Sequence, residues 1–221
     1  MVAYGAQLVA RCWDEGRPED VIEKLQEMVR SYPSVYAWKG ALAISYLQIG
    51  RPDEARRAFE QLASRDFSNM PWNEAGTINF CFLAEIAATL NDAKRARLLY
   101  EILLPAASHF AVVGFASVIR GSIARPLALL AATLGRDDEA DTHFELALQQ
   151  DARIGGPFFI AQTQHDYARF LLGRANPKDL KKAKALVSEA LESAARLELP
   201  HMRDKLLAVQ SELPKETATV S

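Results

Sequence analysis

The side chains best suited to catalysis are scattered along the chain. They are four histidines and two cysteines: His109, His143, His165, His201, Cys12 and Cys81. No two histidines have the spacing that places a pair of zinc ligands on one helix face, and no HExxH motif occurs. The cysteines have no zinc-type spacing and no evident histidine partner for nucleophilic catalysis. The GxxxxGK[ST] loop that cradles nucleotide phosphates is also missing from the sequence. We therefore predict a protein that is not an enzyme, with no catalytic residue, no metal site and no cofactor.

Two of these residues have a structural interpretation. Cys12 falls in a column of packing residues, so we expect a small buried side chain rather than a nucleophile. His143 stands beside the packing residue Phe144, and we expect it at a helix surface.

Clusters of charge can be explained by function or by structure. Asp137, Asp138 and Glu139 could ligate a divalent cation, but acidic residues at a helix start also complement the helix dipole, and we favour this second interpretation. The basic runs KRAR (94–97) and KKAK (181–184) could bind nucleic acid, but no aromatic residues flank them for base stacking. Each run contains an alanine that packs inward, which leaves its charges on a solvated helix face. We predict no nucleic-acid binding in this chain.

The composition is that of a folded soluble protein, with 49% hydrophobic residues, 24% charged residues and a formal net charge of −2. Such a charge gathers neither nucleic acid nor an anionic membrane. No apolar run approaches the roughly 18 residues of a membrane span. The N-terminal residues lack the basic start and apolar core of a secretion signal. We expect a cytoplasmic protein that does not contact a membrane.

A repeated sequence pattern indicates the helices that would position any functional residue. Residues 46–63 read YLQIGRPDEARRAFEQLA and residues 133–148 read TLGRDDEADTHFELAL. Both run from a Gly-Arg turn through acidic residues to alanine, and then to phenylalanine four positions later. The same columns occur five times, with anchor residues 34, 41, 44 and 40 positions apart. These anchors are Val9, Ala43, Ala84, Ala128 and Ala168.

A turn residue follows each anchor. Two helices joined by a short turn need a left-handed residue at the end of the first helix, which glycine adopts freely and asparagine tolerates. The turn residues are Gly16, Gly50, Asn91, Gly135 and, as the weakest match, Ala175. The second helix then packs a small or aliphatic residue against the first, in a column made of Val21, Ala55, Ala96, Ala140 and Ala183.

This pattern predicts an all-α fold, a right-handed superhelix of about five antiparallel helical hairpins. It resembles the tetratricopeptide repeat at Leu42-Ala43, Tyr46, Gly50, Ala55 and Phe59, and the first spacing of 34 residues is that of this family. The alternative is an irregular bundle, but five columns in register argue against it. Apolar residues recur at three and four positions rather than two, so we predict no strand; FAVVGFASVI (110–119) comes nearest to one. We predict a single tetratricopeptide-like domain over residues 1–213 and a polar, disordered tail over 214–221.

A more specific resemblance extends over nearly the whole chain. THFELAL (142–148), IAQTQHDYARFLL (160–172) and the stretch 36–67 resemble the C-terminal helical-repeat module of large bacterial signalling ATPases. In that family the module follows a nucleotidase domain, often with an adenylate/guanylate cyclase domain or a LuxR-type DNA-binding domain elsewhere. Pro126 departs from the aromatic residue expected there, and Gly156-Pro157-Phe158 is a compressed form of the family's segment. The resemblance implies that the ATPase and cyclase chemistry lies outside this chain.

The concave side of such a stack is the expected binding surface, because first helices line it. The non-packing positions on these helices are Gln48, Glu85, Thr89, Arg125, Thr133, Gln162, His165 and Arg169. Among them Arg125, Gln162, His165 and Arg169 could receive a carboxylate or an acidic peptide. The alternative is that they pair within the chain, for example Arg169 with Asp166, or only solubilise the groove.

Two functions remain open at this point. The first is a non-enzymatic interaction and regulatory module that binds a protein segment or a neighbouring domain of its parent protein. The second is a small-molecule sensor domain of a transcriptional or cyclase regulator, which would use the polar cluster together with aromatic residues such as Tyr167 and Phe170. A homo-oligomer could also form through apolar surfaces at the ends of the stack.

Overall fold

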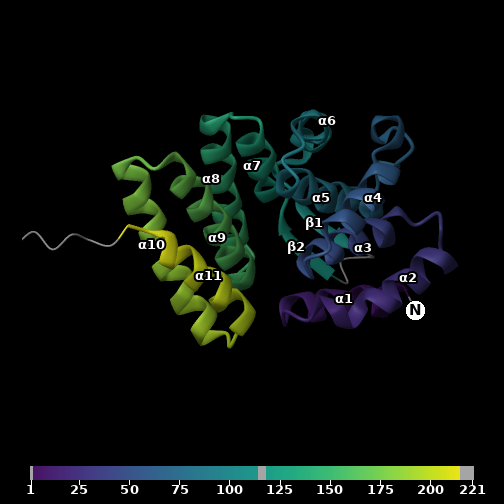
Figure 1. Cartoon of the computed structure of the whole chain (residues 1–221), viewed down its shortest axis with the longest axis horizontal. Coiled ribbons are helices and arrows are strands. Elements are labelled where there is room, and N and C mark those ends of the chain that lie inside the picture. Colours follow the sequence, from purple (N-terminus) through teal and green to yellow (C-terminus); the bar gives the residue numbers. More distant parts are fainter. Residues whose placement is uncertain (1, 114–117, 215–221) are drawn as a thin grey trace, which may run out of the picture.

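The computed structural model describes residues 2–113 and 118–214, and helices make up most of it (Figure 1). Five helical hairpins follow one another: α1 (Val2–Asp14) with η1 (Pro18–Val21) and α2 (Ile22–Ser31), α3 (Tyr36–Gln48) with α4 (Pro52–Leu62), α5 (Glu74–Thr89) with α6 (Ala93–Leu103), α7 (Ala124–Thr133) with α8 (Asp137–Arg153), and α9 (Pro157–Arg174) with α10 (Pro177–Arg196). A final helix, α11 (Pro200–Glu212), packs on α9 and α10. Short 3-10 turns follow α4 and α6 at η2 (Ser64–Phe67) and η3 (Leu104–Ala106). The predicted all-α solenoid of about five hairpins is confirmed.

All five predicted turn residues adopt the left-handed conformation. Their φ angles are +73° at Gly16, +73° at Gly50, +52° at Asn91, +68° at Gly135 and +53° at Ala175. Alanine at the last position has the same geometry as glycine at the others, although its Cβ makes that conformation costlier. The turn prediction is therefore confirmed, including its weakest match.

The predicted packing columns form the core. The five anchors and the five facing residues of the second helices are all buried, with exposed fractions of 5% or less. One continuous hydrophobic core extends from Val9 in α1 to Val209 in α11. A smaller cluster lies where α11 covers the last hairpin, and its buried members are Ala161, Ala190, Ala194, Met202 and Leu206.

The prediction that the chain contains no strand is wrong between α6 and α7. β1 (Phe110–Val113) and β2 (Val118–Ser122) form an antiparallel pair. The β-branched residues Val112, Val118 and Ile119 favour extended backbone. The backbone N–H of Ser122 donates to Oδ1 of buried Asp151 at 2.9 Å, which anchors β2 on α8. This insertion accounts for the long spacing between the third and fourth anchors.

The predicted polar tail, 214–221, lies outside the described residues from position 215 onward. Just before it, Leu213 packs against the main core. None of the described helices is both long and apolar enough to cross a membrane.

Candidate functional site on the concave surface

The guanidinium of Arg125 joins three first helices on the concave side. Arg125 lies on α7 and is 6% exposed. Its Nη2 donates to Glu85 on α5, and its Nη1 donates to Oδ2 of Asp166 on α9 at 2.6 Å. The other carboxylate oxygen of Asp166 lies 2.9 Å from Nδ1 of His165. We call Glu85, Arg125, His165, Asp166 and the nearby Lys205 the concave cluster.

Most charges of this cluster are compensated by other charged groups of the same chain. Burial alone would raise the pKa of Asp166, but the hydrogen bond with His165 and the charge of Arg125 lower it to about 2. Burial opposes the charge of Arg125, yet the carboxylates of Glu85 and Asp166 raise its pKa above the ordinary value. Arg125 and Asp166 are therefore both ionised at neutral pH, and the positive charge of Arg125 is used by two carboxylates.

The expectation that Arg125 receives a ligand carboxylate must accordingly be corrected. Pairing within the chain is what the structure shows for Arg125, because its guanidinium is buried between two acidic side chains. The pair of Arg169 with Asp166 is wrong, since Asp166 is engaged by Arg125 and His165. Arg169 instead lies 3.9 Å from Oε1 of Glu212, and its side chain is 56% exposed.

The other predicted residues fall in two places. Gln48 and Gln162 come together at a cavity of about 30 Å³, which Asp14, Arg120 and Lys205 also line. The hydroxyls of Thr89 and Thr133 are used within their own helices, where they donate at 2.8 Å to the carbonyl oxygens of Glu85 and Leu129.

Lys205 is a residue that sequence reasoning missed. It lies on α11, exposed to solvent, and no hydrogen bond or ion pair of its ammonium is found among the described residues. Desolvation by the surrounding protein lowers the pKa of Lys205, although the nearby carboxylates of Asp166 and Glu85 act to raise it. The repeat pattern does not include it, because α11 follows the five hairpins and the pattern places binding residues on their first helices. The apolar pair Met202 and Leu206, four residues apart, is the sequence signal for this extra helix.

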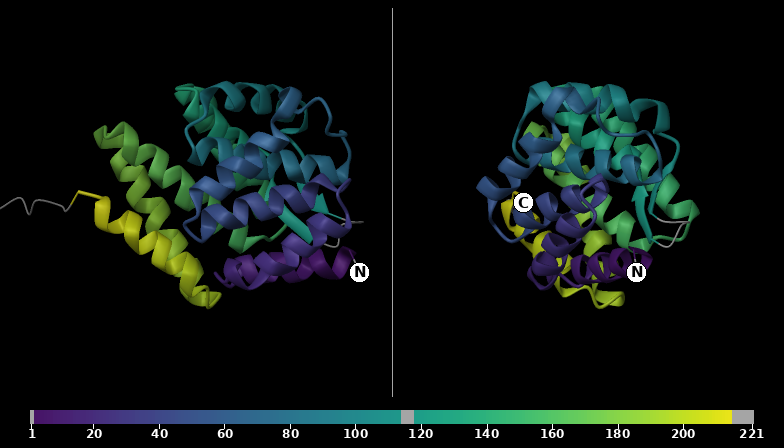
Figure 2. Two further views of the ribbon diagram at one scale, coloured as in Figure 1. Left: turned by 45° about the vertical axis from the view of Figure 1, so that its right-hand side comes forward. Right: turned by 90° about the vertical axis from the view of Figure 1, so that its right-hand side faces the viewer.

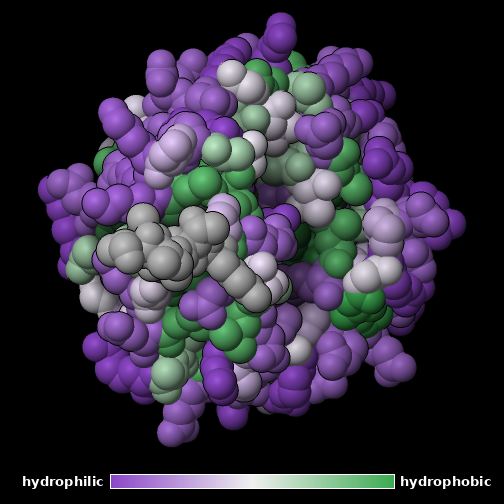
Figure 3. Space-filling model, turned by 60° about the vertical axis from the view of Figure 1, so that its left-hand side comes forward, coloured by the Kyte–Doolittle hydropathy of each residue, from purple (hydrophilic) through white to green (hydrophobic). Residues whose placement is uncertain are grey.

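Hydrogen-bond donors prevail among the groups still free on this surface. They are Nζ of Lys205, for which the described part of the chain offers no partner, and the weakly paired guanidinium of Arg169. Figure 3 shows a hollow on the side where α10 and α11 lie, with hydrophilic residues in its depth and hydrophobic residues on its rim. Such a surface can accept an anionic group.

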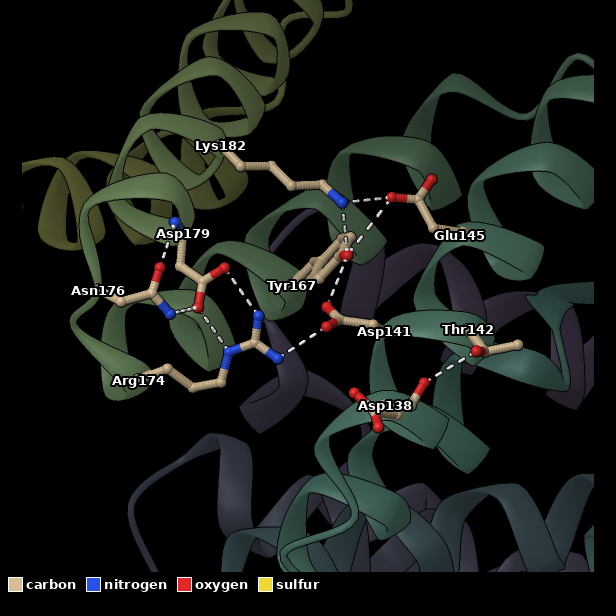
Figure 4. Close-up of polar contacts among 9 residues, drawn as sticks. All are labelled: Asp138, Asp141, Thr142, Glu145, Tyr167, Arg174, Asn176, Asp179 and Lys182. Atoms are coloured by element: carbon tan, nitrogen blue, oxygen red, sulfur yellow. Dashed lines mark hydrogen bonds and ion pairs between the residues drawn. The ribbon is translucent and has the colours of Figure 1, made fainter.

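A second polar cluster, between α8, α9 and α10, is internally paired (Figure 4). The hydroxyl of Tyr167 donates to Oδ1 of Asp141 at 2.7 Å and accepts from Nζ of Lys182 at 2.6 Å. Arg174 donates to Asp141 at 2.7 Å and to both carboxylate oxygens of Asp179. Burial and the acidic neighbours raise the pKa of Tyr167. This cluster ties the last two hairpins together.

The suggestion that Tyr167 contacts a small molecule must also be corrected. Tyr167 is 0% exposed, and its ring stacks on Phe144 with a centroid distance of 4.7 Å. Its aromatic face is therefore used in packing, and only its hydroxyl reaches polar groups of the same chain.

The remaining chemically suggestive residues are built into the core. Cys12 and Cys81 are both buried, as expected for Cys12, and burial raises the pKa of the Cys81 thiol to about 12. The expected surface position of His143 is wrong. It is 8% exposed because the side chain of Tyr100 on α6 lies against it, and its Nε2 lies 2.9 Å from the Tyr100 hydroxyl.

The charge clusters lie as their structural interpretation predicts. Asp137, Asp138 and Glu139 occupy the first turn of α8, and across residues 2–113 and 118–214 no group of three potential ligands is placed to hold a metal ion. In the two basic runs, Ala96 and Ala183 are fully buried, while Lys94, Arg97, Lys181 and Lys184 are exposed.

Comparison with known proteins supports the same architecture. The tetratricopeptide repeat family model matches residues 13–73, from the end of α1 to the start of α5. No curated protein and no solved structure gives a significant match. The fold and this match define the class of protein, a tetratricopeptide-like helical-repeat module.

Proposed function

We propose that the protein is a non-enzymatic interaction module whose concave surface binds an acidic segment of a partner protein or of a neighbouring domain. Tetratricopeptide repeats generally mediate protein–protein interaction, and stacked repeats present an extended concave surface for it. The observation that carries the acidic preference is the imbalance of free groups. Lys205 and Arg169 retain donors, whereas Arg125 neutralises the carboxylates of Glu85 and Asp166.

The setting of this module is part of the same proposal. The likeness of residues 36–67 and 142–172 to the C-terminal repeats of bacterial signalling ATPases supports a parent protein with nucleotidase, cyclase or DNA-binding domains. In that setting the module is cytoplasmic, regulates or recruits through protein contacts, and leaves the chemistry and any nucleic-acid contact to other domains.

A labelled peptide of 12 alternating Glu and Ser residues provides a direct test by fluorescence anisotropy. We expect binding that weakens with salt, and an affinity about tenfold lower for Lys205→Glu, because a charged hydrogen bond is lost. Lys181→Glu is the matched control, since this lysine is exposed on α10, a helix that contributes no residue to the concave cluster. Equal binding of the corresponding Lys-Ser peptide would contradict the proposal.

A small-molecule sensor is the second candidate, and one cavity favours it. A space of about 590 Å³ is lined by Ala10 and Arg11 of α1, Ile119 of β2, and Leu199 and Pro200 before and at the start of α11. This volume is within the usual range of ligand sites. A metabolite that raises the melting temperature of the protein, but not of an Ile119→Arg variant, would support this candidate. If no tested metabolite changes the melting temperature and the acidic peptide binds, the interaction module is favoured over the sensor.

A further inference from the structure

The first and last parts of the solenoid touch each other. The turn after α1 lies against α11, so closely that a Cβ built on Gly16 would overlap the Cβ and Cγ of His201. Figures 1 and 2 both show the purple N-terminal hairpin beside the turn between α10 and α11. Stacking of repeats alone does not produce this contact, because each repeat contacts only its neighbours. The ends are therefore brought together by specific residues.

β2 makes a second contact next to the first. Nη1 of Arg120 donates to Oδ1 of Asp14 at 2.9 Å, and the guanidinium lies 5.2 Å from the centre of the Trp13 ring. Trp13 is itself held by a hydrogen bond of 2.9 Å from its Nε1 to Oγ of Ser45. The strand pair between α6 and α7 thus reaches back to the first hairpin.

These contacts are narrow, and of their residues only Trp13 belongs to the continuous core. The hydrophobic cluster under α11, which contains Met202 and Leu206, is separate from the main core. Asp14 lines both a cavity of about 590 Å³ between α1, β2 and the start of α11 and a cavity of about 30 Å³ that Arg120 and His201 also line. The ends can consequently separate without unfolding a hairpin.

We propose that Asp14, Gly16, Arg120 and His201 form a clasp that closes the solenoid, and that a protein segment reaches the concave surface when the clasp opens. Gln48, Gln162 and Lys205 line the small cavity at the clasp together with Asp14 and His201. Gln48 and Lys205 are already exposed and Gln162 is half-buried, so opening widens the access of a partner segment to these side chains. The acidic nature of the segment that enters rests on the proposed function, whereas the existence of the clasp does not.

Gly16→Ala tests the clasp, and Gly50→Ala is its matched control. Both glycines end a first helix with φ of +73°, so alanine adds the same local strain, but nothing lies within 4 Å of a Cβ at Gly50. Spin labels at Glu23→Cys on α2 and Arg203→Cys on α11 report the distance between the ends by pulsed EPR. Both positions are exposed, while Cys12 and Cys81 are buried.

We expect one short distance in the wild type and in Gly50→Ala, and a longer, broader distribution in Gly16→Ala. Removing the opposing side chain in Gly16→Ala/His201→Gly should restore the short distance. Distributions that are the same in Gly16→Ala and Gly50→Ala would overturn the clasp.

Stopped-flow binding of the same Glu-Ser peptide tests the control of access. Association with Gly16→Ala should be about tenfold faster than with Gly50→Ala, because a larger fraction of the protein is open. Equal rates in variants whose EPR distances differ would overturn this part. A peptide that binds no variant would contradict the proposed function, while the EPR distances would still decide the clasp.

Discussion

Arg125 shows at the scale of one residue how burial changes what a side chain can do. An exposed arginine on a concave surface is a receptor for anions, but here two carboxylates from α5 and α9 surround the guanidinium. Removing one partner of such a buried arrangement leaves charge without compensation, which is far more costly than losing a surface pair.

Replacing Arg125 should therefore destabilise the protein strongly. We expect Arg125→Met to lower the free energy of unfolding by about 3–5 kcal/mol, since Glu85 and Asp166 lose their common cation. Arg169→Met, which removes an exposed arginine from the same surface, should change it by less than about 0.5 kcal/mol. Urea unfolding of both variants measures this. Similar losses of unfolding free energy in the two variants would show that buried Arg125 contributes no more to stability than exposed Arg169.

Asp151 gives a prediction about pH. Burial raises the pKa of Asp151 to about 6, although Ser122, Arg125 and Thr163 favour the ionised form. Because the folded pKa lies above the ordinary carboxyl value of about 3.9, its contribution to stability is full below pH ~4 and is lost as the pH rises through about 6. Wild type should gain up to about 3 kcal/mol from this group between pH 7 and 4.

Asp151→Asn isolates that contribution. The amide can still accept from the Ser122 N–H and can donate to the Thr163 hydroxyl, so the anchoring of β2 is kept. We expect the stability of wild type relative to the variant to rise as the pH falls from 7 to 4, measured by urea unfolding at each pH. A constant difference would show that Asp151 has an ordinary pKa.

At the scale of elements, the turns decide how neighbouring helices pair. Four of the five first-helix turns use glycine or asparagine, but Ala175 carries a Cβ in the same left-handed conformation. A left-handed non-glycine residue costs about 1–2 kcal/mol, which the packing of α9 on α10 offsets.

Ala175→Gly should consequently raise the free energy of unfolding by about 1 kcal/mol. The same substitution at Ala185, exposed in the middle of α10, should lower it by about 1 kcal/mol because glycine weakens a helix interior. Thermal or urea unfolding of the two variants gives the comparison. A destabilised Ala175→Gly would indicate that the alanine methyl group has a packing role.

At the scale of the whole molecule, α11 closes the stack. It covers the last hairpin with Met202 and Leu206 buried and turns a mostly polar face outward. Repeat proteins need such a terminal element, since an uncovered repeat exposes its apolar face. We therefore expect any homo-oligomer to use another surface, and light scattering of Leu206→Asp beside wild type would test whether uncapping causes association.

Uncapping should also act locally. In Leu206→Asp we expect hydrogen exchange to accelerate in α9 and α10 while α3 and α4 keep their protection, because repeats interact mainly with their neighbours. Leu207→Asp is the control, since Leu207 is 40% exposed whereas Leu206 is fully buried. Loss of protection along the whole chain would instead show that the solenoid unfolds as one unit.

The five hairpins, their turns and their packing columns could be derived from the sequence, because each depends on residues close together in the chain. A left-handed turn selects glycine locally, and Ala55 and Phe59 recur with the helical period that buries them. The strand pair was not predicted because its short segments obtain their pairing and anchoring from Asp151 on α8, far away in sequence.

The candidate site depended on tertiary structure for the same reason. The sequence placed Glu85, Arg125 and His165 on first helices, and the fold does bring them together. Arg125 is paired because the fold places Glu85 and Asp166 beside it. Lys205, the cation of the concave cluster that has no partner among the described residues, comes from a helix outside the five repeats. Local periodicity determined the architecture, while burial and partners distant in sequence decided which charges remain for a ligand.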